Sequence, residues 1–190
     1  MTTALHSTLA ACLLLTTAGC AGLERTATRA QGAAQSLVSK TLSANDAAFL
    51  DLASRAGIEQ VTLGQLARRE VGRPAAKVYA IRIVRDHTGI NQQLTQLAEL
   101  KGIDPPSAMD GEHSLQYNEF AALSGRDFER VYLNGQASDQ AAMLKLFQDE
   151  ARDGAAIDVK AFAARNEPTL QTHIDMARKL GGRIVPPVDG

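Results

Sequence analysis

Tryptophan is absent from the 190-residue sequence, and aromatic residues make up only 4% of it. Proteins that bind single-stranded nucleic acids use aromatic side chains as stacking platforms, so no such platform is expected here. Neither sign of charge is in excess, because 20 lysines and arginines stand against 21 aspartates and glutamates. A nucleic-acid-binding surface needs a basic excess, so the composition argues against a nucleic-acid partner.

Cysteine is nearly absent, since only Cys12 and Cys20 occur in the chain. Cys12 belongs to an apolar run at residues 9–15, which is too short to span a bilayer and is typical of an export signal. Removal of this signal leaves Cys20 as the last cysteine. An intramolecular disulfide and a cysteine-based metal or catalytic site are therefore excluded in the folded domain.

Small residues, Thr16-Thr17-Ala18-Gly19, precede Cys20 and resemble the bacterial lipobox, in which the cysteine is lipidated and becomes the new N-terminus. We therefore interpret residues 1–20 as a signal peptide with a lipobox and Cys20 as the lipid attachment site. Ala21 follows the cysteine where an aspartate would retain the protein at the inner membrane, so the resemblance implies the periplasmic face of the outer membrane. The alternative is an ordinary secretory signal and a soluble periplasmic protein.

Strand-like alternation is missing after residue 45, and apolar residues recur there at spacings of three and four, which predicts helices. Alanine is abundant, and this also favours helix. The pattern predicts four long helices and one short one. The long helices cover residues 46–71, 74–101, 124–152 and 155–180, and the short one covers residues 115–123.

Local signals at the helix ends support these assignments. Ser43 or Asn45 is the expected N-cap of the first helix. A capping box that begins at Ser124 is expected to start the third helix. Pro168 predicts a kink or a break near Asn166 in the fourth helix.

The connection over residues 103–123 is long enough to cross the full length of a bundle. Ferritin-like bundles have a long crossover between the second and third helices, whereas a plain up-down-up-down bundle needs only a short loop there. We therefore expect an all-α, ferritin-like four-helix bundle over residues 43–182. A flexible tether over residues 21–42 precedes it, and a loose tail over residues 183–190 follows it.

Polar groups interrupt the apolar seam near the middle of each long helix. Burying such groups without partners is costly, so their alignment predicts one shared site or one shared hydrogen-bonded layer. Counted from the turn at Gly72, Glu59 and His87 stand at nearly the same height and are expected to face each other, with His173 less close. The candidate residues are Glu59, His87, Asn91, Asp139, Gln140 and His173.

Two interpretations of this seam remain open. A mononuclear iron, manganese or zinc site would use Glu59, His87 and His173, with Asp139 as a further ligand. A di-metal centre is disfavoured, because no glutamate stands three residues before either histidine. The competing interpretation is a layer without metal, in which Glu59 accepts a hydrogen bond from His87 and the others complete the network. Some of the candidates would face solvent if the seam is misplaced by a third of a turn.

Other polar residues carry weaker signals. Asp86 is predicted to be a surface partner of Arg82, one turn earlier. His113, in the long connection, is predicted to be exposed. The chain contains no Ser-His-Asp arrangement, phosphate-binding glycine loop or Rossmann fingerprint, so no motif indicates an enzyme.

Several spaced elements form a recognisable set along the chain. They are Asp46-x-x-Phe49, Glu59, Asp86-His87-x-x-x-Asn91-x-x-Leu94, Phe128-x-x-x-Tyr132, Lys160-x-Phe162-Ala163 and Pro168-x-Leu170-x-x-His173-x-x-x-Ala177. Over about residues 43–180 this set resembles the exported bacterial family named domain of unknown function 4142. The resemblance implies a ferritin-like four-helix bundle, often with a signal or lipid anchor, and no assigned activity. Family members commonly carry Asp-His where this chain has Asp139-Gln140, so a third-helix histidine is not implied here.

These observations predict a non-enzymatic structural or partner-binding module of the cell envelope. Its expected partners are the membrane, through a lipid on Cys20, and a protein of the envelope. The alternative is a ferritin-like metal-binding protein that uses Glu59, His87 and His173 in metal handling or oxidative stress.

Overall fold

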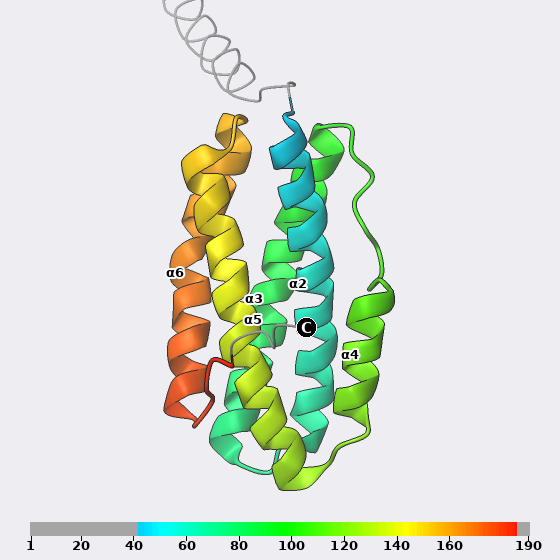
Figure 1. Cartoon of the computed structure of the whole chain (residues 1–190), viewed down its shortest axis with the longest axis vertical. Coiled ribbons are helices and arrows are strands. Elements are labelled where there is room, and N and C mark those ends of the chain that lie inside the picture. The colour runs from blue at the N-terminus through cyan, green and yellow to red at the C-terminus, as the bar shows by residue number, and fades with distance from the viewer. Residues whose placement is uncertain (1–41, 186–190) are drawn as a thin grey trace, which may run out of the picture. The chain divides into compact units, whose positions relative to one another are not determined.

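Five helices and no strand make up residues 42–185, the part of the chain that the computed structural model describes (Figure 1). The prediction of an all-α fold is confirmed for this part. No helix within it is long and apolar enough to cross a membrane. The predicted signal peptide, Cys20 and nearly all of the predicted tether lie outside the described residues. The helices are α2 (Ala44–Glu70), α3 (Pro74–Leu100), α4 (Gly111–Ala121), α5 (Gly125–Asp153) and α6 (Ile157–Lys179).

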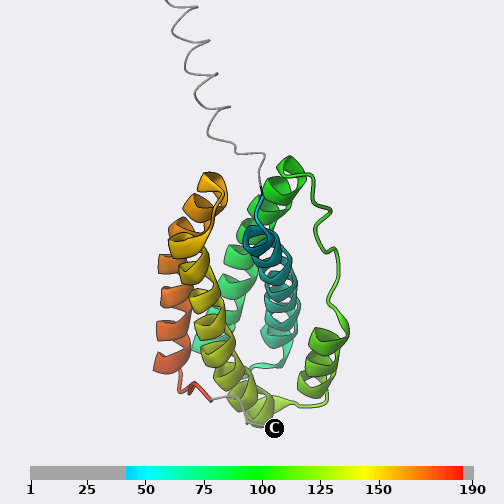
Figure 2. The ribbon, with the colours of Figure 1, turned by 45° about the horizontal axis from the view of Figure 1, so that its top comes forward.

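The four long helices α2, α3, α5 and α6 lie side by side, and neighbours run in opposite directions (Figures 1 and 2). α2 packs on α3 and α5 packs on α6, while contacts of α2 with α5 and of α3 with α6 join the two pairs. α3 ends and α5 begins at opposite ends of the bundle, so residues 101–124 run along its length (Figure 1). The short helix α4 belongs to this segment and covers the outer side of α2.

A complete capping box starts α2. The hydroxyl of Ser43 accepts a hydrogen bond from the Asp46 N–H at 3.0 Å, and the Asp46 carboxylate accepts one from the Ser43 N–H at 2.9 Å. The second carboxylate oxygen of Asp46 accepts a hydrogen bond from the Ala155 N–H at 2.8 Å, so this buried residue also ties α2 to the turn before α6. The capping box predicted at Ser124 is wrong, because the Ser124 side chain makes no hydrogen bond to the first turn of α5.

The helix α6 runs through Pro168 without the predicted break. Proline cannot donate a hydrogen bond to the preceding turn, so one bond of the helix is lost there. Asn166, just before it, is buried and donates its side-chain amide to the Phe162 carbonyl at 2.9 Å.

The chain after α6 turns back and is held against α5. The Arg183 N–H donates to Asn134 Oδ1 at 2.9 Å, and the Val185 N–H donates to Ser138 Oγ at 2.9 Å. The first three residues of the tail predicted to be loose, 183–185, are thus tied to the bundle. Residues 186–190 lie outside the described part.

Two apolar clusters fill the interior and are separated by polar side chains. One cluster is built around Phe49 and Phe147, whose ring centres lie 5.1 Å apart. The other is built around Phe128 and Tyr132, whose rings stack with centres 5.8 Å apart. Between the two clusters each long helix carries a buried polar residue. These residues are Gln60, His87, Gln140 and His173.

Candidate functional site

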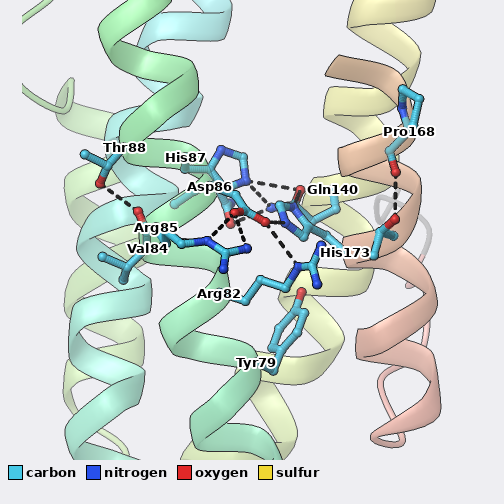
Figure 3. A network of polar contacts seen from close by, with 12 residues as sticks. Tyr79, Arg82, Val84, Arg85, Asp86, His87, Thr88, Gln140, Pro168 and His173 are labelled. Carbon is cyan, nitrogen blue, oxygen red and sulfur yellow. Dashed lines mark hydrogen bonds and ion pairs between the residues drawn. The ribbon is translucent and has the colours of Figure 1, made fainter. Parts of the chain in front are cut away.

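A continuous chain of hydrogen bonds runs through the interior between the two apolar clusters, and we call it the polar ladder. It draws side chains from all four long helices, and Figure 3 shows its part from Asp86 through His173 and Gln140 to His87. Six of its seven members are buried, and the seventh, Asp86, is 13% exposed. The members are Asp86, His173, Gln140, His87, Gln60, Gln136 and Tyr79.

Gln140 of α5 is the centre of the polar ladder. Its Oε1 lies 3.2 Å from His87 Nε2 and 3.1 Å from His173 Nδ1. Its Nε2 donates to Gln60 Oε1 at 2.9 Å. One fully buried amide therefore joins α2, α3 and α6 to α5.

The ladder continues from Gln60 into the apolar interior. Gln60 Oε1 accepts a second hydrogen bond from Gln136 Nε2 at 2.7 Å, and Gln136 Oε1 accepts one from the Tyr79 hydroxyl at 3.2 Å. Burial raises the pKa of Tyr79 far above its ordinary value, so this hydroxyl stays protonated and acts as a donor. The amide groups of this branch are thus satisfied inside the protein.

The other end of the ladder reaches the surface at Asp86. Asp86 Oδ2 lies 3.0 Å from His173 Nε2 and 3.2 Å from Arg82 Nε (Figure 3). Arg85 also donates to the Asp86 carboxylate, at 2.8 Å. Burial alone would raise the pKa of Asp86, but the hydrogen bonds from His173 and Arg85 outweigh it and hold that pKa below the ordinary value. The predicted pairing of Asp86 with Arg82 is confirmed, whereas its link to His173 was not foreseen.

Burial affects both imidazoles of the ladder. Burial lowers the pKa of His87 to about 3, and the nearby His173 adds to this effect. Burial also lowers the pKa of His173, although Asp86 acts in the opposite direction. A general acid or base works best with a pKa near the operating pH, so His87 is not tuned for proton transfer. The arrangement instead suits hydrogen bonding in an apolar surrounding.

The prediction that Glu59 contacts His87 is wrong. His87 directs Nε2 to Gln140, and its buried Nδ1 has no hydrogen-bond partner. Glu59 Oε2 instead lies 3.6 Å from Nε2 of His113 on α4. His173, which was expected to be farther away, has its ring centre 5.3 Å from that of His87.

The remaining candidates, Asn91 and Asp139, are not members of the ladder, although Asp139 is a neighbour of Gln60. Asn91 contacts Gly57, where the two helices α2 and α3 approach so closely that a Cβ atom would meet the Asn91 side chain. Asp139 lines a side pocket of about 290 Å³ together with Glu59 and His113, between α2, α4 and α5. His113, predicted to be exposed, is half-buried, with its side chain 22% exposed. The structure thus groups His87, Gln140 and His173, and places Glu59 and Asp139 under α4.

The predicted metal triad does not form. Among the side chains that the structure describes in residues 42–185, no three from histidine, cysteine, aspartate or glutamate are arranged to hold a metal ion. His87 and His173 come together, but the group between them is the amide of Gln140. An uncharged amide is a weaker ligand for iron or zinc than the carboxylate that Glu59 would have supplied.

Sequence reasoning missed four ladder members, Gln60, Gln136, Tyr79 and Asp86. One available signal was the spacing of Gln136 and Gln140, which places two amides on one face of α5. The adjacency of Asp86 to His87 was a second signal.

Fold and ladder together define an all-helical bundle with a buried polar layer of glutamine and histidine. The chain belongs to the family described as a domain of unknown function, DUF4142, which matches residues 29–180. The resemblance inferred from the sequence is therefore confirmed. A comparison with curated proteins found no matching sequence.

A solved structure with a similar fold comes from Bacillus halodurans and is provisionally described as a spore coat protein. The two chains are 15% identical, with a TM-score of 0.57, and the match covers 78% of this chain and 96% of the other. At this identity the similarity concerns the fold alone.

Asp139→Asn is expected to raise the free energy of unfolding by about 1–2 kcal/mol at pH 7.5 and to leave it unchanged near pH 3.5. Burial raises the pKa of Asp139 to about 6, although Gln60 and His113 act in the opposite direction. A carboxyl whose folded pKa is raised loses its stabilising contribution as the pH rises through that pKa, and asparagine carries no such penalty. Urea unfolding at the two pH values measures the difference.

The exposed residue Asp104 supplies the control for this substitution. Asp104→Asn should change stability little at either pH. An Asp139→Asn variant that is less stable than the natural protein at pH 7.5, or equally stabilised at both pH values, would contradict the expected burial penalty.

Proposed function

We propose that the chain is a non-enzymatic module of the bacterial cell envelope, folded as a ferritin-like four-helix bundle with a long connection between α3 and α5. Its polar ladder serves to fix the packing of the helices. The observation that carries the proposal is the Gln140 amide, which is fully buried and bonded to partners on three other helices. A site built for chemistry would present such groups to a substrate.

The position of the ladder explains how it would select one arrangement of the helices. Apolar clusters lie on both sides of it, so sliding one helix by a turn would place an amide or imidazole among apolar side chains. Each buried polar group that loses its partner costs about 1–3 kcal/mol. Apolar packing alone discriminates less sharply, because leucine and phenylalanine side chains tolerate many partners. Polar groups in helix interfaces fix register in this way.

The envelope part of the proposal rests on the sequence before the bundle. The lipobox-like residues ending at Cys20 support attachment to the periplasmic face of the outer membrane, with a protein of the envelope as a further partner.

Cys20→Ala is expected to move the protein from the membrane fraction to the soluble fraction. Bacterial lipoproteins are held by several acyl chains, since a single chain binds a membrane only weakly, and all of them are attached through this cysteine. Immunoblots of fractionated cells measure the distribution. Cys12→Ala is the matched control, because Cys12 leaves with the signal, and it should change nothing. Unchanged fractionation of the Cys20 variant would rule out the lipid anchor.

One observation favours a metal-binding alternative. Nitrogen atoms of His87 and His173 both lie within 3.2 Å of the same Gln140 oxygen, so two ligands converge on one point. Elemental analysis of protein purified without chelator tests this alternative. The structural role predicts far less than one iron, manganese or zinc per chain, and a stoichiometric metal would favour metal handling instead.

A further inference from the structure

The bundle carries opposite charges at its two ends, although both signs alternate along the sequence. We call the end where α2 and α6 finish and α3 and α5 begin the basic end; it comprises residues 66–77, 119–130 and 175–183. This end carries nine basic residues against five acidic ones, Glu70, Glu119, Asp127, Glu129 and Asp175. The basic residues are Arg68, Arg69, Arg73, Lys77, Arg126, Arg130, Arg178, Lys179 and Arg183.

The opposite end has the reverse balance. It comprises residues 43–48, 97–104 and 149–160, where seven acidic residues stand against three basic ones. The fold therefore separates charges that cancel in the whole chain, whose net charge is −1. The net charge of the whole chain therefore does not reveal the cationic surface at one end.

All nine basic residues of the basic end are exposed. The buried acid there, Glu129, is already neutralised by Arg73 and accepts hydrogen bonds from the N–H groups of Gly72 and Arg73, both at 3.1 Å. Burial would raise the pKa of Glu129, but these contacts outweigh it and hold that pKa below its ordinary value. Glu129 is thus an internal partner of Arg73. Arg130 lies 3.5 Å from Asp127, but both of these side chains are exposed, so the cation stays accessible to an external anion.

The cations come from all four long helices and spread over the whole end. α2 contributes Arg68, α3 contributes Lys77, and α6 contributes Arg178. Arg126 and Arg130 of α5 border a shallow pocket of about 520 Å³ at the same end. A linear polyanion would be matched by one stripe or groove of cations, whereas this distribution matches a broad, flat anionic surface. Seven of the nine are arginines, whose planar guanidinium groups bind phosphate through paired hydrogen bonds.

We propose that the basic end docks onto an anionic phospholipid surface through the headgroup phosphates. The chain reaches the bundle at the first turn of α2, at the acidic end, and α2 is 27 residues long. At a rise of about 1.5 Å per residue, the basic end stands roughly 40 Å from that point. The inference that the basic end points away from the membrane anchor rests on the proposed attachment through Cys20. The inference that the basic end attracts anionic lipid does not depend on that attachment.

Vesicle co-sedimentation tests the docking. The full chain carrying Cys20→Ala, taken from the soluble fraction, is mixed with vesicles of phosphatidylcholine or of phosphatidylcholine with phosphatidylglycerol. We expect binding to the anionic vesicles alone, weakening as salt is added. Arg126→Glu with Arg130→Glu should lower the affinity at least about tenfold. The matched control, Lys145→Glu with Arg165→Glu, makes the same change in net charge at exposed sites elsewhere and should stay within about twofold.

Several results would overturn the proposal. They are equal binding to both kinds of vesicle, equal loss in the control variant, and undiminished binding after reversal of Arg126 and Arg130. Tight binding of soluble polyphosphate with no binding to anionic vesicles would also overturn it, because the basic end would then recognise a free polymer. The vesicle test uses a chain without lipid, so a failure to bind vesicles would not contradict the Cys20 anchor. Equally, unchanged fractionation of the Cys20 variant would not affect the vesicle result.

Discussion

Gln140→Leu is expected to lower the free energy of unfolding by about 3–5 kcal/mol. The substitution keeps the buried volume nearly constant but removes the shared partner of His87 and His173. Nε2 of His87 and Nδ1 of His173 lose their partner, while His173 keeps Asp86. Each buried ring nitrogen without a partner costs about 1–3 kcal/mol, and Gln60 loses one of its two donors. Urea unfolding followed by circular dichroism measures the loss.

The matched control is Gln93→Leu, at an exposed position of α3. It makes the same chemical change outside the core and should alter stability by less than about 0.5 kcal/mol. A Gln140 variant as stable as this control would show that the central amide contributes nothing to the fold.

Gln140→His is expected to convert the ladder into a zinc site. The new imidazole would join His87 and His173 around the point now occupied by Gln140 Oε1. Those two nitrogens lie 3.2 Å and 3.1 Å from that oxygen, so each must move by about 1 Å to reach a zinc ligand distance of roughly 2.0–2.1 Å. Asp86 already holds the far nitrogen of His173, as carboxylates commonly do for zinc ligands.

The measurement is the melting temperature with and without added zinc. At a zinc concentration of about 100 times its dissociation constant, the variant should gain about 2.7 kcal/mol, or roughly 5–10 °C. The natural protein and the Gln140→His, His87→Leu double variant should not respond. A shift of the same size in the natural protein would mean that the amide does not keep metal out.

The helices could be predicted from the sequence because their signals are local. Pro74 at the start of α3 and Gly102 after its end are signals of this kind, and Gly102 has the positive φ, 74°, that favours glycine. Periodicity alone also placed His87 and His173 in the interior. The expected capping box at Ser124 failed because side-chain rotation, unlike apolar spacing, leaves no pattern in the sequence.

The prediction that Glu59 faces His87 failed because α4 covers a second side of α2. An apolar stripe that includes Glu59 also passes through Leu52, seven residues earlier, but Leu52 is 52% exposed, and Ala53 and Gln60 face the centre. Glu59 is nonetheless buried, since α4 packs over that side of α2. A helix covered on two sides has a broad apolar face, so its pattern does not show which polar residue points inward. Contacts of α4 depend on where the long connection runs, and this is a tertiary property.

The glutamines of the ladder could not be recognised as buried residues from the sequence. Gln60 and Gln136 carry no charge and suit exposed helix positions as well as buried ones, so the type of residue does not reveal its place. Only the meeting of four helices shows that Gln60 accepts from Gln136 and Gln140 together.

The most direct test of the structural role compares Gln140→Leu alone with the triple variant His87→Leu, Gln140→Leu, His173→Leu in urea unfolding. Asp86 keeps Arg82 and Arg85, and Gln60 keeps Gln136, so the triple variant leaves no ladder group stranded. If the ladder acts as one hydrogen-bonded unit, the triple variant should be more stable than the single one by about 1–3 kcal/mol. A triple variant destabilised by the sum of the three separate losses would contradict the account.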